Sequence, residues 1–402
     1  MYEVIREGKA AIRVKKADKI SKEMEVFYNP VMKLNRDISV LLLNSMDKDK
    51  LIIADPLAGT GIRSIRFVLE LNKPKIKAIA INDYSKNAVK SIKNNLKLNK
   101  INKFSIIKNT MNNSSNDRII KKNNNESGNN KIKVYNEDAN LFLLKSSGFD
   151  YIDIDPFGSS NSYLEAAIKR ISRKGILAIT NTDTAALTGT YPEACARKYW
   201  SMAKRDYMMH ETGLRILLRK IQLVGMQYEK ALIPIFSYFK DHYFRVFFEC
   251  IKGKKLCDEV AKQHGMLNGA GPLWMGQLWD DKLANKMYSA LLKKSNKKIP
   301  ISKQTYKNYN NDNPIIIKEG IINNSELPKF LKIIKAESKI NAVGFYDLHD
   351  IARKKKLKTM MRKDDIIKKI KKKGLNAANT HFSGTGIRSD ISYDGLLKLL
   401  KE

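Results

Sequence analysis

Between residues 51 and 180, short runs of consecutive apolar residues alternate with segments in which apolar residues recur every three or four positions. A run of four to six apolar-rich residues bounded by Asp, Asn, Pro or Gly predicts a buried strand. Apolar residues three or four positions apart predict the helix that follows. The strands predicted in this way lie at residues 51–54, 76–81, 131–135, 149–154 and 175–180. The predicted helices begin near residue 62, cover residues 85–99 and 161–172, and include a short one after residue 139.

Repeated strand–helix units predict a mostly parallel sheet with helices on both faces. Two further helices between residues 192 and 228 lead to residues 231–239 and 243–251, which are typical of a closing antiparallel pair. We therefore predict an α/β domain that covers residues 1–255. In such sheets ligands bind beyond the carboxyl ends of the strands, near the point where strand order reverses.

The pattern changes near residue 256, where the chain becomes helical, lysine-rich and interrupted by loops with Asn and Pro. We predict a smaller α+β domain over residues 256–402. Its last sixty residues suggest helices at 348–356 and 363–373 and a hairpin within 376–393. This order is typical of a winged-helix module that contacts nucleic acid, although a plain helical cap remains an alternative. Residues 109–130, rich in Asn, Ser, Lys and Gly, predict a low-complexity insertion.

Charge and cysteine content narrow the class of protein. The 402 residues include 75 Lys and Arg against 41 Asp and Glu, a net charge of +34. This excess indicates a polyanionic partner, because neutralised phosphates release counterions, while lysine-biased residue usage is the alternative. The absence of an apolar run of 18 residues and of a signal-peptide core predicts a cytoplasmic protein without membrane contact. Three cysteines with no Cys-x-x-Cys pair predict no disulfide framework and no metal site.

The loop after the first strand carries Gly59 and Gly61, which let the backbone approach a ligand at a helix N-terminus. The motif alone is weak, since Gly-Thr-Gly-Ile-Arg recurs at 384–388 without a strand before it. Ser64 replaces the third glycine of the dinucleotide fingerprint, which favours S-adenosylmethionine over a nicotinamide cofactor. Asp83, which closes the second strand, is suited to accept both ribose hydroxyls, or else it only caps the next helix.

The turn after the fourth strand, Asp155-Pro156-Phe157-Gly158, is the most informative motif. An exocyclic amine on a base is a poor nucleophile, because its lone pair is delocalised into the ring. A carboxylate and a proline-fixed carbonyl provide two acceptors that orient such an amine, and Phe157 provides a ring for stacking. The alternative is an ordinary strand-end turn with a buried phenylalanine.

Four residues near the predicted pocket remain open in role. Phe27 is a candidate to pack on the cofactor, and Arg36 is a candidate partner of its carboxylate. Arg63 and Arg66 lie in the first turns of the first helix, where they are candidates to contact the cofactor in the pocket or else face the solvent.

The chain resembles the archaeal and eukaryotic tRNA guanine-26 N2-dimethyltransferases over nearly its whole length. The resemblance rests on strings in one order: Glu7-Gly8-Lys9-Ala10, Val26-Phe27-Tyr28-Asn29-Pro30, Asn35-Arg36-Asp37, residues 55–63, Asn82-Asp83, residues 153–158, residues 182–187, Tyr191-Pro192-Glu193, His210-Glu211, Gly271-Pro272-Leu273-Trp274 and His381-Phe382-Ser383.

The resemblance implies a class I, Rossmann-like methyltransferase domain with an appended C-terminal domain. It implies methylation of the 2-amino group of guanine 26 in tRNA, once and then again, with S-adenosylmethionine as the methyl donor. It also implies that Asp155, Pro156 and Phe157 form the catalytic loop. Residues whose positions match the family's cofactor site are Arg36, Arg66, Asp83, Asp138 and Ala139. Many relatives carry two Cys-x-x-Cys pairs that this chain lacks, so we expect no zinc.

Two other functions stay open from the residues alone. The same loop chemistry would serve adenine amino methylation of DNA or ribosomal RNA. A non-catalytic RNA-binding protein with a degenerate fold is the third possibility, although the intact catalytic loop argues against it. We expect tRNA as the partner and no obligate protein partner.

Overall fold

The computed structural model describes residues 2–15, 24–107, 131–295, 317–319, 326–357 and 360–401. The chain divides into two compact units, Met1–Ile179 with Ala290–Asn324, and Thr180–Ser289 with Ser325–Glu402. The domain boundary expected near residue 255 stays a prediction. The insertion expected at 109–130 lies outside the described residues.

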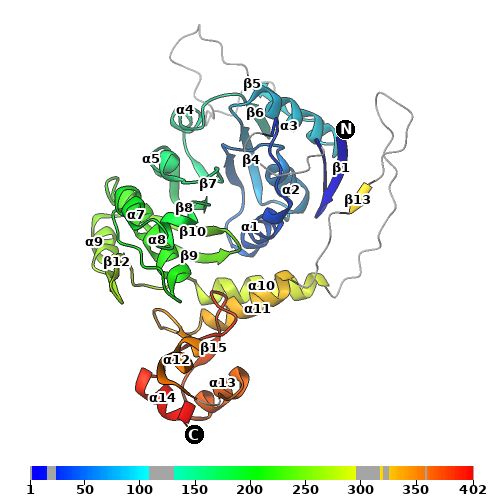
Figure 1. The fold of residues 1–402 in the computed structure, drawn as a ribbon. Coiled ribbons are helices and arrows are strands. Elements are labelled where there is room, and N and C mark those ends of the chain that lie inside the picture. The colour runs from blue at the N-terminus through cyan, green and yellow to red at the C-terminus, as the bar shows by residue number, and fades with distance from the viewer. Residues whose placement is uncertain are drawn as a thin grey trace. The chain divides into compact units, whose positions relative to one another are not determined.

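An eight-stranded sheet forms the centre of the fold, in the order β5-β6-β4-β3-β7-β8-β10-β9 (Figure 1). The first six of these strands are parallel, and β9 and β10 are antiparallel to each other. The α/β prediction is thereby confirmed. The strands are β3 (Leu51–Asp55), β4 (Ile76–Asn82), β5 (Ser105–Ile107), β6 (Ile132–Tyr135), β7 (Phe149–Ile154), β8 (Ile171–Asn181), β9 (Lys230–Lys240) and β10 (Tyr243–Lys252).

Strand order reverses between β3 and β7, because β4 and β6 extend the sheet to one side of β3 and β7 and β8 extend it to the other. Asp55 ends β3 and Asp155 follows β7, so the two acids flank this switch point. Two differences from the sequence-based expectation concern strand length. The three-residue β5 is too short for a pattern to identify, and β8 begins at Ile171 rather than at residue 175.

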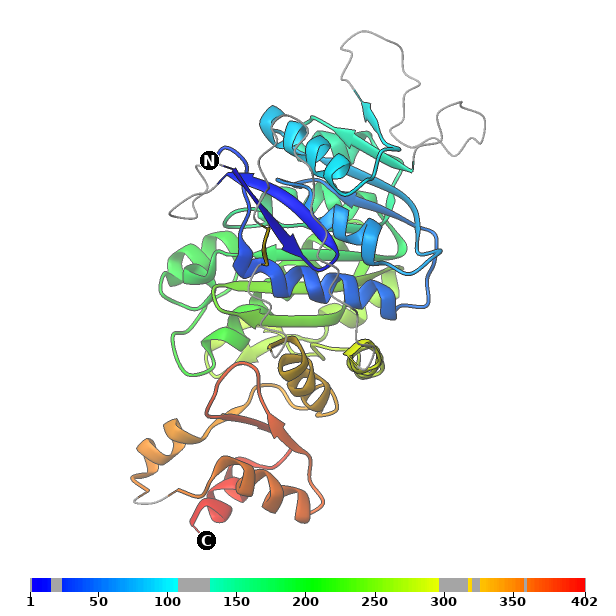
Figure 2. The same ribbon diagram turned by 90° about the vertical axis from the view of Figure 1, so that its right-hand side faces the viewer.

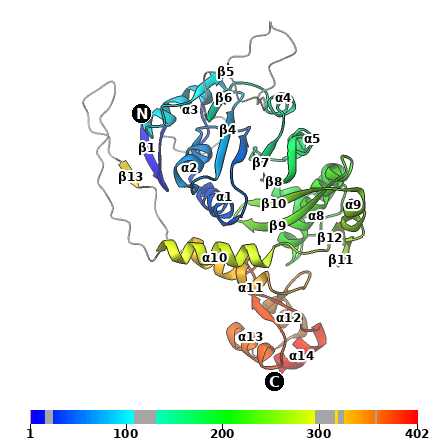
Figure 3. The same ribbon diagram turned by 180° about the vertical axis from the view of Figure 1, so that it is seen from behind.

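Helices cover both faces of the parallel part of the sheet (Figures 1 and 3). One face carries α1 (Lys33–Ser45), α2 (Ile62–Glu70) and α3 (Lys86–Leu98), and the other carries α4 (Ala139–Lys145) and α5 (Asn161–Arg170). Sequence sets where these helices begin. Gly61, in a left-handed conformation at φ 78°, is the N-cap of α2, and the side chains of Ser85 and Asp138 cap α3 and α4. The helices therefore start directly at the strand ends where the candidate residues lie.

An N-terminal hairpin adds a layer to the first unit (Figure 2). Its strands, β1 (Tyr2–Glu7) and β2 (Ala10–Lys15), are antiparallel, and β13 (Ile317–Glu319) pairs parallel with β1. The hairpin packs on α2 and α3, where the side-chain oxygens of Asn95 and Asn99 accept hydrogen bonds from the backbone of β2. Glu7, the last residue of β1, is buried there and contacts Arg36 of α1 and Arg66 of α2.

The second unit contains the helices α6 (Thr184–Leu187), α7 (Pro192–Tyr199), α8 (Met209–Met226), α9 (Lys254–Ala261) and α11 (Glu326–Glu337). The helix α10 (Asp281–Ser295) runs from this unit into the first. The hairpin of β11 (His264–Leu267) and β12 (Ala270–Trp274) departs from the helical character expected after residue 256.

The C-terminal segment forms its own small core (Figure 3). Its helices α12 (Leu348–Lys355) and α13 (Lys363–Lys372) confirm the two predicted helices, and β15 (Ala377–Asn379) with β16 (Gly386–Ser389) forms the predicted hairpin. A short strand, β14 (Tyr346–Asp347), also pairs with β16. The chain ends in α14 (Tyr393–Lys401), a helix that the sequence analysis did not predict.

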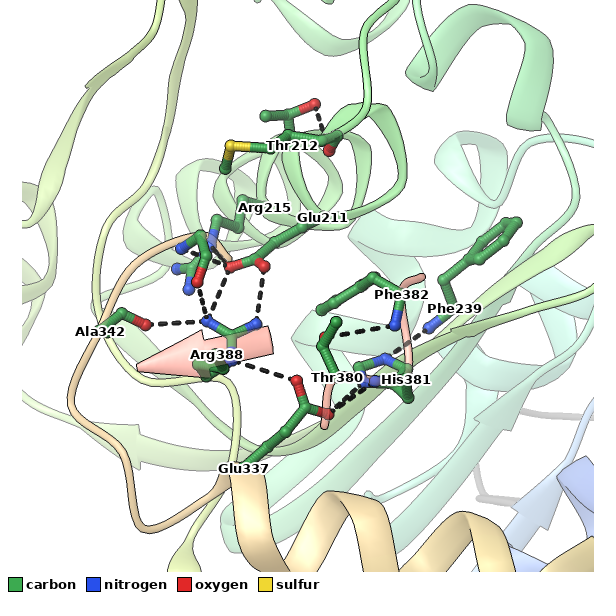
Figure 4. Close-up of polar contacts among 12 residues, drawn as sticks. Glu211, Thr212, Arg215, Phe239, Glu337, Ala342, Thr380, His381, Phe382 and Arg388 are labelled. Carbon is green, nitrogen blue, oxygen red and sulfur yellow. Dashed lines mark hydrogen bonds and ion pairs between the residues drawn. The ribbon is translucent and has the colours of Figure 1, made fainter. Parts of the chain in front are cut away.

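A buried charge network lies inside the second unit (Figure 4). Arg388 donates to Glu211 at 2.6 Å and to Glu337 at 3.1 Å, and the second oxygen of Glu337 contacts Nδ1 of His381 at 2.6 Å. The side chains of all four are at most 1% exposed. Arg388 belongs to the Gly-Thr-Gly-Ile-Arg string at 384–388. This second copy of the motif therefore supplies an arginine to a buried ion-pair network.

Candidate active site

The loops after β3 and β4 meet through Asp83. One carboxylate oxygen accepts a hydrogen bond from the Gly59 backbone at 2.8 Å, and the other accepts one from the Ser85 backbone at 2.9 Å. Ser85 itself caps α3 through its hydroxyl. Asp83 therefore helps to shape the start of α3 and also ties the glycine loop to the second strand. Burial raises the pKa of its carboxyl group.

Gly59 has little space around it. Its φ is +54°, and a Cβ at this position would lie 3.0 Å from the Phe27 carbonyl oxygen. Any larger residue would meet both backbone strain and this close contact. The loop thus brings Phe27 and Asp83 to either side of a single glycine.

A cavity of about 690 Å³ opens beside Asp83. Asn82 shapes it, because its side-chain amide donates to the carbonyls of Pro56 and Glu137 at 3.0 Å each. Tyr84 is 79% exposed at its edge. The lining residues are Tyr84, Ser85, Lys86, Asn87, Asn136, Glu137 and Asp138.

Asp138 lies in this lining and also caps α4, since it accepts hydrogen bonds from the backbones of Asn140 and Leu141 at 2.9 and 3.0 Å. The neighbouring Ala139 is buried. Asp138 therefore lines the cavity, and Asp83, which is bound to Gly59, directly precedes the lining residues Tyr84 and Ser85.

Arg36 and Arg66 share one buried acid, Glu7. Arg36 donates two hydrogen bonds to it at 2.7 and 2.6 Å, and Arg66 donates one at 2.8 Å. Arg66 also pairs with Asp37 and Glu70 at 2.7 Å each. Burial alone would raise the pKa of Glu7. The positive charges and hydrogen bonds of Arg36 and, to a smaller extent, of Arg66 outweigh burial and lower the pKa to about 2. The expected contact of both arginines with a cofactor stays a prediction.

Asp155 is held by Arg63 at the end of β7. The guanidinium donates to Oδ2 of Asp155, lies 3.3 Å from Asp153, and donates to the Asn35 side chain at 2.9 Å. The Asp155 side chain is 22% exposed, and within the described residues its Oδ1 accepts no hydrogen bond. One oxygen is thus fixed and the other is available to a substrate. The expected contact of Arg63 with a cofactor stays a prediction.

Phe157 extends the turn towards the glycine loop. Its ring lies edge-on to Phe27, with centroids 4.3 Å apart, and its side chain is 51% exposed. Since the Phe27 carbonyl lies against Gly59, the Asp155-Pro156-Phe157 turn and the glycine loop belong to one site. An exposed aromatic ring beside a half-buried carboxylate is suited to a flat, hydrogen-bonding substrate such as a base.

Asp55 is a further acid beneath this site. It accepts a hydrogen bond from Ser64 at 2.7 Å and is 2% exposed. Burial raises its pKa to about 7, against the opposing effect of Arg63. Burial therefore favours the neutral form of Asp55, which limits the negative charge around Asp153 and Asp155.

Sequence reasoning missed Glu7, Glu70 and the cavity residues Tyr84 and Asn136. Glu70 lies four residues after Arg66 on the same helix, a spacing that indicates an ion pair. Glu7 gave no such signal, because its partners lie 29 and 59 residues away.

A model of the N2,N2-dimethylguanosine tRNA methyltransferase family matches residues 8–115, 102–269 and 265–401. The chain belongs to this family. The predicted resemblance is thereby confirmed, and the family match extends through the second unit as well as the first.

Full-length relatives support the same assignment. The tRNA (guanine(26)-N(2)/guanine(27)-N(2))-dimethyltransferase of Aquifex aeolicus is 34% identical over 435 residues, which cover 100% of this chain and 96% of the relative. The tRNA (guanine(26)-N(2))-dimethyltransferase of Pyrococcus horikoshii is 33% identical over 418 residues, which cover 99% and 97%.

The solved structure of Trm1 from Pyrococcus horikoshii with S-adenosyl-L-methionine is also similar. It matches with a TM-score of 0.78 and 32% identity, covering 99% of this chain and 100% of that one. The Rossmann-like methyltransferase fold with a C-terminal domain is therefore confirmed. In the described part of the chain, no helix is long and apolar enough to span a membrane, and no group of three potential metal ligands occurs.

Proposed function

We propose that this chain transfers methyl groups from S-adenosylmethionine to the N2 amino group of guanine 26 in tRNA, once and then again. The observation that carries the proposal is the position of the Asp155-Pro156-Phe157 turn beside Phe27 and Gly59. Family membership supports the choice of base and of RNA. The enzyme is thus a tRNA (guanine-26-N2)-dimethyltransferase.

The site fits S-adenosylmethionine in shape and in donor set. A Cβ at Gly59 would lie 3.0 Å from the Phe27 carbonyl oxygen, and Asp83, bound to Gly59, directly precedes the cavity residues Tyr84 and Ser85. Asp83 would hold the ribose hydroxyls, and Asp138 with Ala139 would contact the base end. Arg36 and Arg66 would bind the carboxylate end, and Gly61 would keep the helix start open. The bound cofactor supplies a methyl group on a positively charged sulfur.

The residues of the turn orient the guanine amine. Oδ1 of Asp155 and the carbonyl oxygen of Pro156 would accept hydrogen bonds from the two N–H groups. These bonds would orient the nitrogen so that its lone pair points out of the ring plane towards the methyl group. The carboxylate also balances the positive charge that develops on the nitrogen as the new bond forms. As the new N–C bond forms and the donor's S–C bond breaks, the nitrogen would pass one proton by way of the Asp155 carboxylate to solvent. One N–H then remains, and one of the same acceptors would orient the amine for the second transfer.

Phe157 would stack on the guanine once the base leaves the RNA stack. Extrusion of a base costs a few kcal/mol, and stacking on an exposed ring offsets part of this cost. Arg63 keeps Asp155 in place throughout, because its guanidinium is also bound to Asp153 and Asn35. Phe27, in edge contact with Phe157, would pack on the cofactor side.

The positive charge of the chain supports tRNA as the partner. A net charge of +34 favours a polyanion, and we expect the basic C-terminal segment to contact phosphates. We further propose a cytoplasmic location, no membrane association and no obligate protein partner.

The deciding experiment uses purified protein, labelled methyl donor and a tRNA transcript with guanine at 26. Dimethylguanosine at this position, found by nucleoside mass spectrometry and primer extension, is the expected product. A matched transcript with adenine at 26 and guanine at 27 tests whether the enzyme selects its target by its position in the tRNA or by the type of base. Methyladenosine in either transcript, or no methylated nucleoside at all, would contradict the proposal.

A further inference from the structure

A second surface with nucleotide-binding chemistry lies in the second unit, at the end of α7. Trp200 follows the last residue of this helix and is 49% exposed. Its backbone is left-handed, at φ 55°, which is uncommon for a bulky residue. Such strain persists only where the surroundings hold the residue in place.

Three contacts hold Trp200 and its neighbour. Arg219 of α8 donates to the Trp200 carbonyl at 3.0 Å, and Nζ of Lys220 lies 2.9 Å from the centroid of the ring system. Two residues on, Met202 exchanges backbone hydrogen bonds with Gly271 at 2.8 Å. Since α7 packs against α8 (Figure 1), Lys220 of α8 lies against the indole, and about half of Trp200 stays exposed to solvent.

The cations behind the indole lack anionic partners. Lys220 is 7% exposed, and among the described residues its ammonium forms no hydrogen bond or ion pair. Nε of Arg219 is buried without a hydrogen-bond partner in that same part of the chain. Burial lowers the pKa of Lys220 to about 8, so the side chain still carries its charge at neutral pH. A partly buried cation without an acid partner favours an anionic ligand, because a bound anion compensates the lost hydration.

Further cations lie within five residues of Trp200 in the sequence. Arg197, Lys204 and Arg205 are exposed, and within the described residues they form no ion pair with an acid. A scattered exposed aromatic residue is common on protein surfaces. An indole held against Lys220, with further unpaired cations close by in the sequence, is different, because it combines a stacking face for a base with positive charge for phosphates.

We infer that Trp200 is a stacking platform for an unpaired or extruded nucleotide of tRNA, with Lys220 and the cations near it in the sequence available to its phosphates. The inference rests on the proposed function for the identity of the RNA. It concerns a contact separate from the methylated guanine, which we assign to the Phe157 turn of the first unit.

Direct binding of unmodified tRNA transcript to the full-length protein tests the platform. Trp200→Ala and Trp200→Leu should raise the tRNA Kd about tenfold, while Trp200→Phe, which keeps a stacking ring, should stay within about threefold of wild type. Lys220→Met should weaken binding and reduce the slope of log Kd against log salt. Lys255→Met, the same change at an exposed lysine of α9, is the matched control for lost charge.

Cofactor binding, measured by calorimetry, should stay unchanged in all these variants, which shows that the first unit is intact. Unchanged tRNA affinity in both Trp200→Ala and Trp200→Leu would overturn the inference, as would a Trp200→Phe variant as weak as Trp200→Leu. Wild-type protein that binds tRNA through Trp200 but leaves guanine 26 unmethylated would overturn the proposed function and not the platform.

Discussion

Arg63 binds one oxygen of Asp155 and leaves the other oxygen to the solvent side of the turn. The two residues lie 92 positions apart, on α2 and directly after β7, and the arginine is 5% exposed. Because Arg63 also lies 3.3 Å from Asp153, a single guanidinium positions the end of this strand. The carboxylate that we propose as the amine acceptor is therefore oriented before any substrate arrives.

Replacing Arg63 should impair turnover more than binding. Without the guanidinium, Asp155 loses its fixed orientation, and a misplacement of about 1 Å can lower the rate about 100-fold. We expect Arg63→Met to lower kcat by about that factor, and Arg63→Lys, which keeps the charge, to recover part of it. Methyl transfer under saturating tRNA and cofactor measures this. A raised cofactor Kd at unchanged kcat would instead place Arg63 on the cofactor.

Replacing Asp83 should weaken cofactor binding. The carboxylate is linked to Gly59 and directly precedes the cavity residues Tyr84 and Ser85, and hydrogen bonds to a charged group contribute about 1.5–3 kcal/mol. Asp83→Ala should therefore raise the Kd for S-adenosylmethionine by at least about tenfold, as measured by calorimetry. The tRNA affinity of the same variant provides the control and should not change. Equal cofactor affinity in variant and wild type would remove Asp83 from the site.

Glu7 should make the first unit sensitive to acid. Its pKa is lowered from an ordinary value of 4.5 to about 2, so its contribution to stability is complete above pH 4.5 and is lost as the pH falls towards 2. The size of this contribution is about 3 kcal/mol. Urea unfolding between pH 3 and 7 should show the loss in wild type and a smaller pH dependence in Glu7→Gln. A variant with the wild-type pH dependence would contradict this assignment.

The buried network around Arg388 should stabilise the second unit. Burial would raise the pKa of Glu211, but Arg388 and Arg215 outweigh it and lower the pKa to about 2, so the acid is ionised at neutral pH. Glu211→Gln leaves Arg388 without its closest anion, at a cost of about 3–5 kcal/mol. We expect a lower melting temperature in scanning calorimetry, while the exposed Glu193→Gln should melt like wild type. Equal melting of Glu211→Gln and wild type would argue against the network.

The strands and the loop acids were predictable because their signals are local. Each of Asp55, Asp83 and Asp155 follows an apolar run, and parallel strands place their carboxyl ends at one edge of the sheet. The helices that follow also begin where glycine, Ser85 or Asp138 predicts a cap. Local rules of this kind describe most of the first unit.

The partners of the arginines were not predictable, since ion pairs over long sequence distances leave no local pattern. Arg66 reaches back 59 residues to Glu7, and Arg388 reaches back 177 residues to Glu211. The same Gly-Ile-Arg letters carry Arg63 at the candidate active site and Arg388 in a buried network. Only the fold distinguishes these two settings.

The most direct test of the account is single-turnover methylation of a guanine-26 transcript by the Asp155→Ala variant, with Kd for S-adenosylmethionine measured on the same preparation. We expect no dimethylguanosine at position 26 and a cofactor Kd within several-fold of wild type, because the carboxylate acts on the amine and not on the cofactor. Methylation at the wild-type rate would contradict it.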